Sequence, residues 1–500
     1  MINFLKKSIA KIWAKNHVAK TKDFKNNAEV LQEKLLLDLV KKSEKTLFGL
    51  QHNFSEIKTV EDFQKNVKIS DYEDLKPFVE KVKHGDKNIL WPEKPEYFAK
   101  TSGTTSGTKY IPLTKEGMDY QVKAAQSALF HYIAQKNNAD FVNGKMIFLQ
   151  GSPELEDIND IKTGRLSGIV AHHIPKYLQK NRLPSYETNC IEDWETKVDK
   201  IVEETEKENM TLISGIPPWL IMYFEKLIER NGKKIKQLFP NLQLIVTGGV
   251  NYEPYREKME ELLGGKVDII QTFPASEGFF AFQDDYEKEG LLLQSNHGIF
   301  YEFIPLELYG KPDAPRLTLK EVELNKDYAL ILTTNSGLWA YSIGDVVRFI
   351  SKNPHRILVS GRTKHFTSAF GEHVIAFEVE EAMKATVEKF PAQITEFHLA
   401  PQVNPENGEL PYHEWFIEFE KEPENLESFR QNLDAEMRKR NTYYDDLIAG
   451  NILQVLKITK LQKNAFQEYA KSEGKLGGQN KIPRLANDRK IGDFLKNFKI

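Results

Sequence analysis

In the first 90 residues, apolar side chains recur every three or four positions among charged ones, most regularly over residues 28–40. This period places the apolar side chains on one face of a helix. We therefore predict a helical N-terminal segment over residues 1–90.

The first thirteen residues carry the same period, with Phe4, Leu5, Ile9, Ile12 and Trp13 interleaved with lysines. Charge interrupts the apolar run, so a signal peptide is not expected. The pattern predicts an amphipathic helix that packs against the body of the protein. A helix lying on a membrane surface is the alternative that the same pattern allows.

Farther along the chain, helical patterns alternate with short apolar runs. The helical patterns cover residues 117–134, 194–206 and 218–230, and the apolar runs cover residues 146–149, 212–213 and 242–247. This alternation is typical of a parallel sheet covered by helices.

At about residues 298–350 the alternation gives way to closely spaced strand patterns with turn residues between them. They predict a mainly antiparallel, β-rich subdomain. Residues 351–355 have the composition of a turn, and a mixed pattern of strands and helices follows. The sequence therefore predicts an α/β protein with a large N-terminal α/β domain over residues 1–357 and a small α+β domain over residues 358–500.

Composition limits the partners of this protein. The chain has 500 residues, of which 69 are basic and 72 acidic, for a net charge of −3. This balance does not favour binding to nucleic acid or to an anionic membrane. No apolar run approaches the roughly 20 residues that span a bilayer, and the single cysteine, Cys190, cannot form an internal disulfide. We expect a cytoplasmic monomer whose partners are small molecules.

Residues 101–109 combine two glycines, six hydroxyl side chains and a terminal lysine. The glycines let the backbone approach an anion, while hydroxyls, backbone N–H groups and Lys109 suit phosphate oxygens. Three residues separate Gly103 from Gly107, and Thr108 precedes Lys109, so the spacing is not that of a Walker A loop. The segment predicts a polyphosphate-binding loop, and a flexible surface loop is the alternative.

Three apolar strand patterns end in residues that suit a nucleotide. The first ends in Gly248 and Gly249, which leave room for a ligand at the carboxyl edge of a sheet. The second delivers Phe273, which suits a planar base, and Glu277, which suits a divalent cation. The third delivers Asp345, whose carboxylate suits sugar hydroxyls. An ordinary tight turn explains each motif equally well on its own.

In their order and spacing, residues 101–112, 273–278 and 341–345 resemble the three nucleotide motifs of the Gretchen Hagen (auxin-responsive promoter) family. Members of this family are acyl-acid amido synthetases of the adenylate-forming superfamily, together with acyl-CoA synthetases and firefly luciferase. The similarity runs from about residue 70 to the C-terminal end, where residues 477–484 resemble the family's late Gly…Gln-x-Lys-x-Pro-Arg signature. The resemblance implies an N-terminal adenylation domain and a mobile C-terminal domain.

The resemblance also implies a reaction in two steps. A small carboxylic acid would first react with ATP, releasing pyrophosphate, and an amine, usually an amino acid in this family, would then displace AMP to form an amide. A carboxylate is a poor electrophile and needs such a leaving group before an amine can attack it. The charge that develops calls for Mg²⁺ and fixed donors.

By the same resemblance, we expect Lys481 to reach the reacting carboxylate and α-phosphate, Lys109 to hold the departing phosphates, and Glu277 to hold Mg²⁺. The residues expected to bind the nucleotide are Ser102, Gly103, Thr104, Thr105, Ser106, Gly107, Thr108, Gly248, Gly249, Thr272, Phe273, Pro274, Ala275, Ser276, Tyr341, Asp345 and Arg362. The residues expected to bind the acyl group are Ile216, Trp219 and Tyr223, for which core packing is the alternative.

Two positions depart from the family pattern. Ser342 follows Tyr341 where the family usually has an arginine, and Glu372 and His373 stand where plant members carry a lysine at the hinge. We expect either His373 or Lys364 to make the equivalent contact.

The adjacent His172 and His173 suggest a metal site. Adjacent side chains on a strand point to opposite faces, however, and no matching cluster of ligands is visible nearby. We therefore do not expect a structural metal there.

Two other functions remain open. An acyl-CoA ligase shares the adenylation step and transfers the acyl group to a thiol instead of an amine. A non-catalytic sensor of nucleotide or carboxylate would require loss of the catalytic groups, yet Lys109, Glu277, Asp345 and Lys481 are all present. A purely structural protein would leave the three motifs as accidents.

Overall fold

The protein is represented by a computed structural model, which describes residues 2–21, 25–102, 108–174, 179–191, 193–249, 252, 255–363, 366–367, 374–403, 405, 409–449, 453–474, 482–486 and 488–500. The chain divides into two compact units. The first comprises Met1–Gly249 and Leu263–Leu358, and the second comprises Val250–Leu262 and Val359–Ile500. The second unit therefore includes a short segment that interrupts the first one in sequence.

The predicted N-terminal helices are confirmed. They are α1 (Ile2–Lys20), α3 (Ala28–Lys42), α4 (Leu47–Gln51), α5 (Val60–Asn66) and α6 (Tyr72–Lys83). Helices α5 and α6 each begin with a capping box, in which Thr59 and Asp71 accept backbone N–H groups of the first turn. Such caps satisfy donors that have no partner inside the helix.

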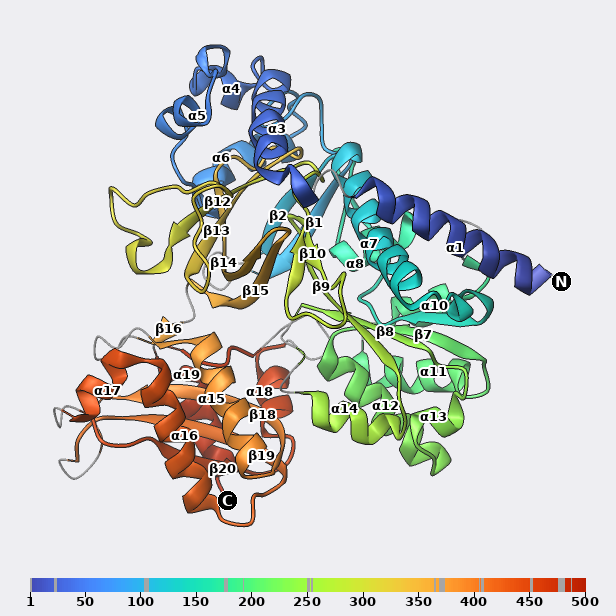
Figure 1. The fold of residues 1–500 in the computed structure, drawn as a ribbon, viewed down its shortest axis with the longest axis vertical. Helices are drawn as coiled ribbons and strands as arrows, with labels where there is room; N and C mark the ends of the chain where they lie inside the picture. Colours follow the sequence, from blue (N-terminus) through green and yellow to red (C-terminus); the bar gives the residue numbers. More distant parts are fainter. Residues whose placement is uncertain are drawn as a thin grey trace. The chain divides into compact units, whose positions relative to one another are not determined.

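Helix α1 lies along α7 (Lys115–Lys136), as Figure 1 shows. Ala14 is fully buried in this contact, and the His17 ring is hydrogen-bonded to the Ser127 hydroxyl at 2.7 Å. The helix packs against the body of the protein as expected, but not through the apolar side chains of its pattern, because Ile9, Ile12 and Trp13 are 40%, 58% and 58% exposed. None of the described helices is both long and apolar enough to cross a membrane.

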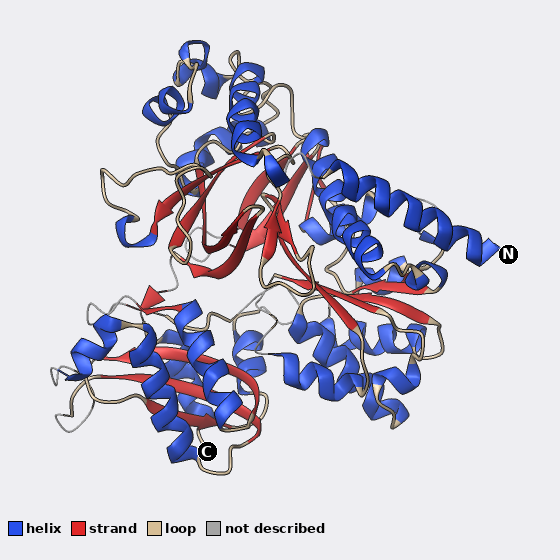
Figure 2. Ribbon diagram, in the orientation of Figure 1, coloured by secondary structure: helices blue, strands red, loops and turns tan. Residues whose placement is uncertain are grey.

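An eleven-stranded sheet runs through the first unit, in the order β12-β13-β14-β15-β11-β10-β9-β8-β7-β3-β6. Figure 2 shows the strands in red. Neighbouring strands from β9 to β6 pair in parallel. These strands are β9 (Asp268–Ala275), β8 (Leu244–Gly248), β7 (Met210–Ser214), β3 (Lys145–Phe148) and β6 (Arg182–Leu183). Helices lie between them in the chain, as the alternating pattern predicted, and α11 (Trp194–Thr205) and α12 (Pro217–Asn231) coincide with predicted helical segments. The other connecting helices are α8 (Leu166–His172), α10 (Tyr186–Cys190), α13 (Ile235–Leu238) and α14 (Arg256–Leu263), of which all of α14 but Leu263 belongs to the second unit.

The β-rich part of the sheet is antiparallel, as predicted, but it is longer than the expected residues 298–350, because it runs from Gly278 to Arg362. It comprises β10 (Gly278–Phe282), β11 (Leu291–Leu293), β12 (Ile299–Pro305), β13 (Asp327–Thr334), β14 (Tyr341–Lys352) and β15 (His355–Arg362). It is continuous with the parallel part, because β9 pairs with β8 on one edge and with β10 on the other. The parallel and antiparallel parts, which differ in their sequence patterns, therefore form one continuous sheet.

A second, four-stranded sheet of order β2-β1-β5-β4 lies within the same unit. Its strands are β1 (Tyr97–Ser102), β2 (Thr108–Leu113), β4 (Glu156–Ile158) and β5 (Ile161–Gly164). Strands β1 and β2 form an antiparallel hairpin, so the hydroxyl-rich segment is the connection between two paired strands.

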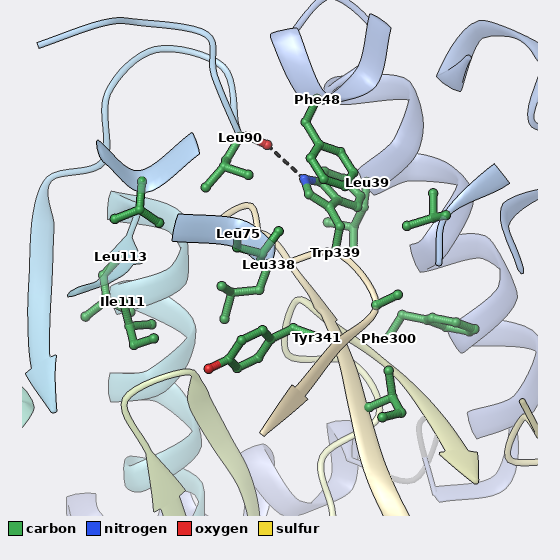
Figure 3. Close-up of a cluster of buried hydrophobic side chains, with 14 of the residues drawn as sticks. Leu39, Phe48, Leu75, Leu90, Ile111, Leu113, Phe300, Leu338, Trp339 and Tyr341 are labelled. Carbon is green, nitrogen blue, oxygen red and sulfur yellow. Dashed lines mark hydrogen bonds between the residues drawn. The ribbon is translucent and has the colours of Figure 1, made fainter. Parts of the chain in front are cut away.

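A large apolar core joins the N-terminal helices to the antiparallel strands (Figure 3). Its centre is Trp339, which is fully buried and donates its indole N–H to the Leu90 carbonyl at 2.9 Å. The Phe54 ring meets the indole edge to face, with centroids 4.8 Å apart. Because the indole nitrogen has a partner, this large side chain is buried without an unsatisfied donor.

One local expectation was wrong. His172 ends helix α8 and is not on a strand, and its Nε2 lies 2.8 Å from the Pro153 carbonyl oxygen, while His173 Nε2 lies 3.1 Å from the Tyr97 hydroxyl.

The turn predicted within residues 351–355 is confirmed. Asn353 and Pro354 form it, between the end of β14 and the start of β15.

The second unit contains a three-stranded sheet, β18-β19-β20, with helices packed around it. Its elements are β16 (Phe366–Thr367), β17 (Val374–Ile375), α15 (Ala376–Lys389), β18 (Gln393–Gln402), β19 (Tyr412–Lys421), α16 (Leu426–Arg440), α17 (Thr442–Ala449), β20 (Lys457–Leu461), α18 (Ala465–Ser472) and α19 (Lys490–Leu495). Trp415 is fully buried at its centre. This mixture of elements agrees with the α+β character predicted for the C-terminal part.

A buried ion pair in the first unit should be essential for stability. The Glu302 carboxylate is 0% exposed and accepts Nε and Nη2 of Arg316 at 2.9 and 2.7 Å. Replacing Arg316 with Met would leave a buried carboxylate without its cation, and we expect a loss of about 3–5 kcal/mol of unfolding free energy. Urea denaturation followed by circular dichroism measures this loss.

The matched control is Lys42→Met, which removes the cation of the exposed Lys42–Glu116 pair. We expect that substitution to cost less than about 1 kcal/mol. Equal losses in the two variants would show that burial does not govern the contribution of these pairs.

Candidate active site

The hydroxyl-rich segment connects the ends of the β1–β2 hairpin, where Ser102 pairs with Thr108 and Thr101 with Lys109. Residues 103–107, which include Gly103, Thr104, Thr105, Ser106 and Gly107, lie outside the described residues. Only the backbone of Ser102 and Thr108 is described. Their expected contacts with phosphate therefore stay predictions, but the paired strands on either side hold the ends of the segment next to each other.

Lys109 is half-buried at the start of β2, next to helix α6. Its ammonium nitrogen lies 5.6 Å from the centroid of the Tyr72 ring, and the Tyr72 hydroxyl accepts the Tyr110 backbone N–H at 2.9 Å. Burial raises the pKa of Tyr72 above its usual value. A neutral tyrosine thus anchors β2 and offers the ring face to the lysine, a contact that favours a cation.

The ends of β8 and β9 meet with little space between them. Gly248 pairs with Thr272, and a Cβ atom on Gly248 would lie 2.5 Å from the Thr272 carbonyl oxygen. Gly249 has a φ of +80°, which favours glycine. The Thr272 hydroxyl donates to the Thr247 carbonyl at 3.0 Å. Close packing at Gly248 and the positive φ of Gly249 therefore explain why both positions are glycine.

The Phe-Pro-Ala-Ser-Glu motif forms the end of β9 and a two-residue turn. Ala275 pairs with Gly278, so Ser276 and Glu277 are at the tip of the hairpin. Phe273 is buried, and its ring meets the Phe280 ring edge to face at 5.0 Å. Pro274 pairs with Phe279 in the same hairpin. The hairpin positions Glu277, whereas stacking of Phe273 on a base stays a prediction.

A small polar cavity lies beside Glu277. Four separate segments line it, and their polar side chains include Gln121, Glu277, His297, Asn335 and Ser336. Burial lowers the pKa of His297 to about 4, so its imidazole is neutral at pH 7. Apart from the Glu277 carboxylate, the polar side chains that line the cavity are therefore uncharged hydrogen-bonding groups.

Gln121, His297 and Asn335 were not predicted, because they belong to no motif and are far apart along the chain. Hydrogen bonds from Thr114 show how they come together: its hydroxyl donates to the Asn335 carbonyl at 2.9 Å, and its backbone N–H donates to the Ser336 hydroxyl at 3.2 Å. These bonds join the end of β2 to the turn between β13 and β14. The only sequence signal was Thr114 itself, which is the N-cap of α7.

The third motif begins β14. Tyr341 is 2% exposed and belongs to the apolar core (Figure 3). Ser342, where the family usually has arginine, lies with its hydroxyl 2.8 Å from the Tyr309 hydroxyl. Gly344 has a φ of +81°, and the half-buried Asp345 follows it. The glycine therefore sets the backbone conformation that leads into Asp345, whose ribose contact stays a prediction.

The three residues expected to bind the acyl group lie at the start of α12. Ile216 is half-buried at the N-cap, and Trp219 is 5% exposed. Tyr223 is fully buried and donates its hydroxyl to Thr205 at 2.7 Å. The structure gives Tyr223 a packing role, which was the alternative, and leaves Ile216 as the most accessible of the three.

Several expected residues of the C-terminal part lie outside the described residues, namely Lys481, Lys364 and His373. Arg362 ends β15, and its side chain is not described. The segment that follows Lys481 lies along β18, because the Leu399 N–H donates to the Arg484 carbonyl at 2.8 Å. Arg484 is also ion-paired with Glu396. Within the second unit, the chain is thus anchored three residues after Lys481.

Among the described residues, no three His, Cys, Asp or Glu side chains gather in a way that would hold a metal ion. A magnesium ion that enters with a nucleotide needs few protein ligands, since it keeps waters and takes phosphate oxygens. The role of Glu277, at the tip of its hairpin, in holding this ion stays a prediction.

The fold defines the class of protein. The structure resembles that of AtGH3.15 acyl acid amido synthetase in complex with 2,4-DB, with a TM-score of 0.79 and 17% identity over 97% of this chain and 96% of the other. It also resembles 2-hydroxyisobutyryl-CoA ligase with a bound acyl adenylate, with a TM-score of 0.62 and 13% identity over 93% of this chain and 90% of the other. The protein therefore shares the fold of these two enzymes, and the predicted fold class is confirmed.

The sequence comparisons define the family. The GH3 family N-terminal domain matches residues 17–183 and 159–269, the central domain matches residues 292–362, and the C-terminal domain matches residues 377–490. Indole-3-acetic acid-amido synthetase GH3.3 of Arabidopsis thaliana is 22% identical, over 96% of this chain and 94% of the relative. The chain belongs to the GH3 family, and the resemblance seen in its motifs is confirmed.

Replacing Gly248 with Ala should impair the candidate site. The added Cβ would lie 2.5 Å from a backbone oxygen of the neighbouring strand, so β8 or β9 must move. We expect at least a tenfold weaker affinity for ATP, equivalent to about 1.4 kcal/mol. Isothermal titration calorimetry measures it.

The control for this variant is Gly265→Ala. Its Cβ would meet only the Lys236 side chain, at 3.1 Å or more. A flexible side chain can move aside, so ATP affinity should not change. Unchanged affinity in the Gly248 variant would remove this edge of the sheet from the nucleotide site.

Proposed function

We propose that this protein is an acyl-acid amido synthetase, which activates a small carboxylic acid as an acyl adenylate and transfers the acyl group to an amine, usually an amino acid. The main support is membership of the GH3 family along most of the chain. One relative, which aligns with this chain over 94% of its own length, is an amido synthetase. The retention of Lys109, Glu277, Asp345 and Lys481 supports an active enzyme over a sensor.

ATP with Mg²⁺ would supply the leaving group that makes the acid reactive. In the proposal, Lys109 and the hydroxyl-rich segment hold the β- and γ-phosphates, and Glu277 contributes to the metal site. Gly248 and Gly249 let the backbone approach the nucleotide, and Asp345 accepts hydroxyl groups of the ribose. Fixed donors and charges of this kind stabilise the negative charge that develops in the transition state, and they need not reorganise during the reaction.

Lys481 is proposed to contact the reacting carboxylate and α-phosphate. This role requires the C-terminal domain, residues 358–500 in the proposal, to move relative to the adenylation domain over residues 1–357 when the second substrate enters. Protease cleavage near residues 353–364 should then change when ATP and the acid are added. Cleavage that ignores both ligands would count against the movement.

A thioester-forming ligase is the second candidate, because a CoA ligase shares this fold. The two candidates differ only in the acceptor that attacks the acyl adenylate. Membership of the GH3 family favours the amine.

The first experiment measures AMP and pyrophosphate formed from ATP and Mg²⁺ with a panel of aromatic and aliphatic carboxylic acids. Parallel reactions contain either mixed amino acids or coenzyme A, and mass spectrometry identifies the products. We expect AMP that depends on the acid, together with a new amide mass. AMP with a thioester and no amide would select the ligase, and no AMP with any acid would favour a binding protein.

Lys109→Ala and Glu277→Ala should each slow adenylation about a hundredfold, since loss of one fixed charge or donor in such a site costs about 3 kcal/mol. The measurement is acid-dependent exchange of pyrophosphate into ATP. The matched controls are Lys115→Ala and Asp119→Ala, two exposed charges near the start of α7. Equal rates in a variant and its control would exclude that residue from the reaction.

A further inference from the structure

Helix α1 exposes a set of apolar and basic side chains that its packing does not use. We define the outer face of α1 as Lys6, Ile9, Ile12, Trp13 and Lys15, all of which are exposed. Ile12 and Trp13 are each 58% exposed and Ile9 is 40% exposed. No other described helix exposes more than one large apolar side chain.

The opposite side of α1 fixes which side chains point outward. Ala14 is fully buried against the domain, Lys7 is ion-paired with Asp140 at 2.5 Å, and His17 is bonded to Ser127. These contacts hold α1 along α7 (Figure 1). The outer face is therefore displayed by a docked helix, and the helix would not have to leave the domain to use it.

Helix α1 also differs from the rest of the chain in charge. It carries five lysines, Lys6, Lys7, Lys11, Lys15 and Lys20, and no acidic residue. Because the whole chain has a net charge of −3, the residues outside α1 carry −8. Among the described residues, no carboxylate forms an ion pair with Lys6 or Lys15. Lys6 and Lys15 thus add exposed basic charge before and after the exposed apolar residues of α1.

The combination of apolar and basic side chains selects among possible partners. Apolar side chains exposed together mark an interaction surface. A second copy docked on this face would bring two sets of lysines together, which like-charge repulsion opposes. An anionic bilayer offers both an apolar interior for Ile12 and Trp13 and negative head groups for the lysines.

We propose that the outer face of α1 is a docking surface for an anionic lipid bilayer, on which the helix lies in the plane of the interface. The apolar side chains enter the boundary between head groups and acyl chains, and Lys6 and Lys15 contact the head groups. This inference is independent of the proposed enzymatic function. It also revises the expectation of no membrane partner, which depended on the net charge of the whole chain rather than on where the charge lies.

The test is co-sedimentation of the full chain with vesicles of phosphatidylcholine, alone or mixed with phosphatidylglycerol. We expect binding to the mixed vesicles, little binding to phosphatidylcholine alone, and release at high salt, because salt screens the lysines. Binding to both kinds of vesicle alike, or to neither, would overturn the proposal.

The apolar part of the surface is tested with the double variant Ile12→Ser/Trp13→Ser. Its partition into mixed vesicles should fall at least about tenfold, since two apolar side chains no longer leave water. The matched control is Val30→Ser/Leu50→Ser, which removes two apolar side chains that are 69% and 65% exposed on other helices. An equal fall in both variants would overturn the assignment to α1.

The basic part is tested with Lys6→Glu/Lys15→Glu against Lys68→Glu/Lys266→Glu, two exposed lysines outside α1. Both pairs change the net charge equally, so only a local effect of α1 makes the first pair bind more weakly. Sedimentation equilibrium without lipid completes the experiment. Self-association that Ile12→Ser/Trp13→Ser abolishes, without vesicle binding, would assign the face to a second copy and overturn the lipid proposal.

Discussion

The first unit depends on the main-chain pairing of one strand, β9. It bonds in parallel with β8 along one edge and antiparallel with β10 along the other, so a single strand joins the helix-covered sheet to the β-rich part. Backbone N–H and C=O groups buried in a sheet must be paired, and the two halves therefore cannot shift independently at this point. The same strand carries Phe273 and ends in the turn that holds Glu277.

The pairing at β9 also explains why the candidate residues lie at one end of the strands. Parallel strands end at a common edge, where the last residue of β8, Gly248, pairs with Thr272, three residues before β9 ends. Close approach at that edge excludes a side chain at Gly248. The close packing of the two strands thus requires the glycine at position 248.

The core around Trp339 has a corresponding role for the N-terminal helices. The indole joins residue 90, at the end of the helical segment, to the turn before β14. The helical period of the first 90 residues predicted these helices, because each has one apolar face. It could not predict their partner, since an apolar face specifies burial and leaves open which surface covers it. The cavity beside Glu277 has the same origin, in side chains from segments that are distant in sequence.

The sequence by itself determined the kind of elements, the change from parallel to antiparallel strands and the family, because these follow from local periodicity and from the order and spacing of short motifs along the chain. It also identified the residues at the strand ends. Only the tertiary structure decided that the parallel and antiparallel strands share one sheet, that Tyr223 packs against Thr205, and that His297 and Asn335 lie near Glu277. Those relations depend on contacts between residues far apart in the chain, and a local sequence pattern does not specify which distant surfaces will pack together.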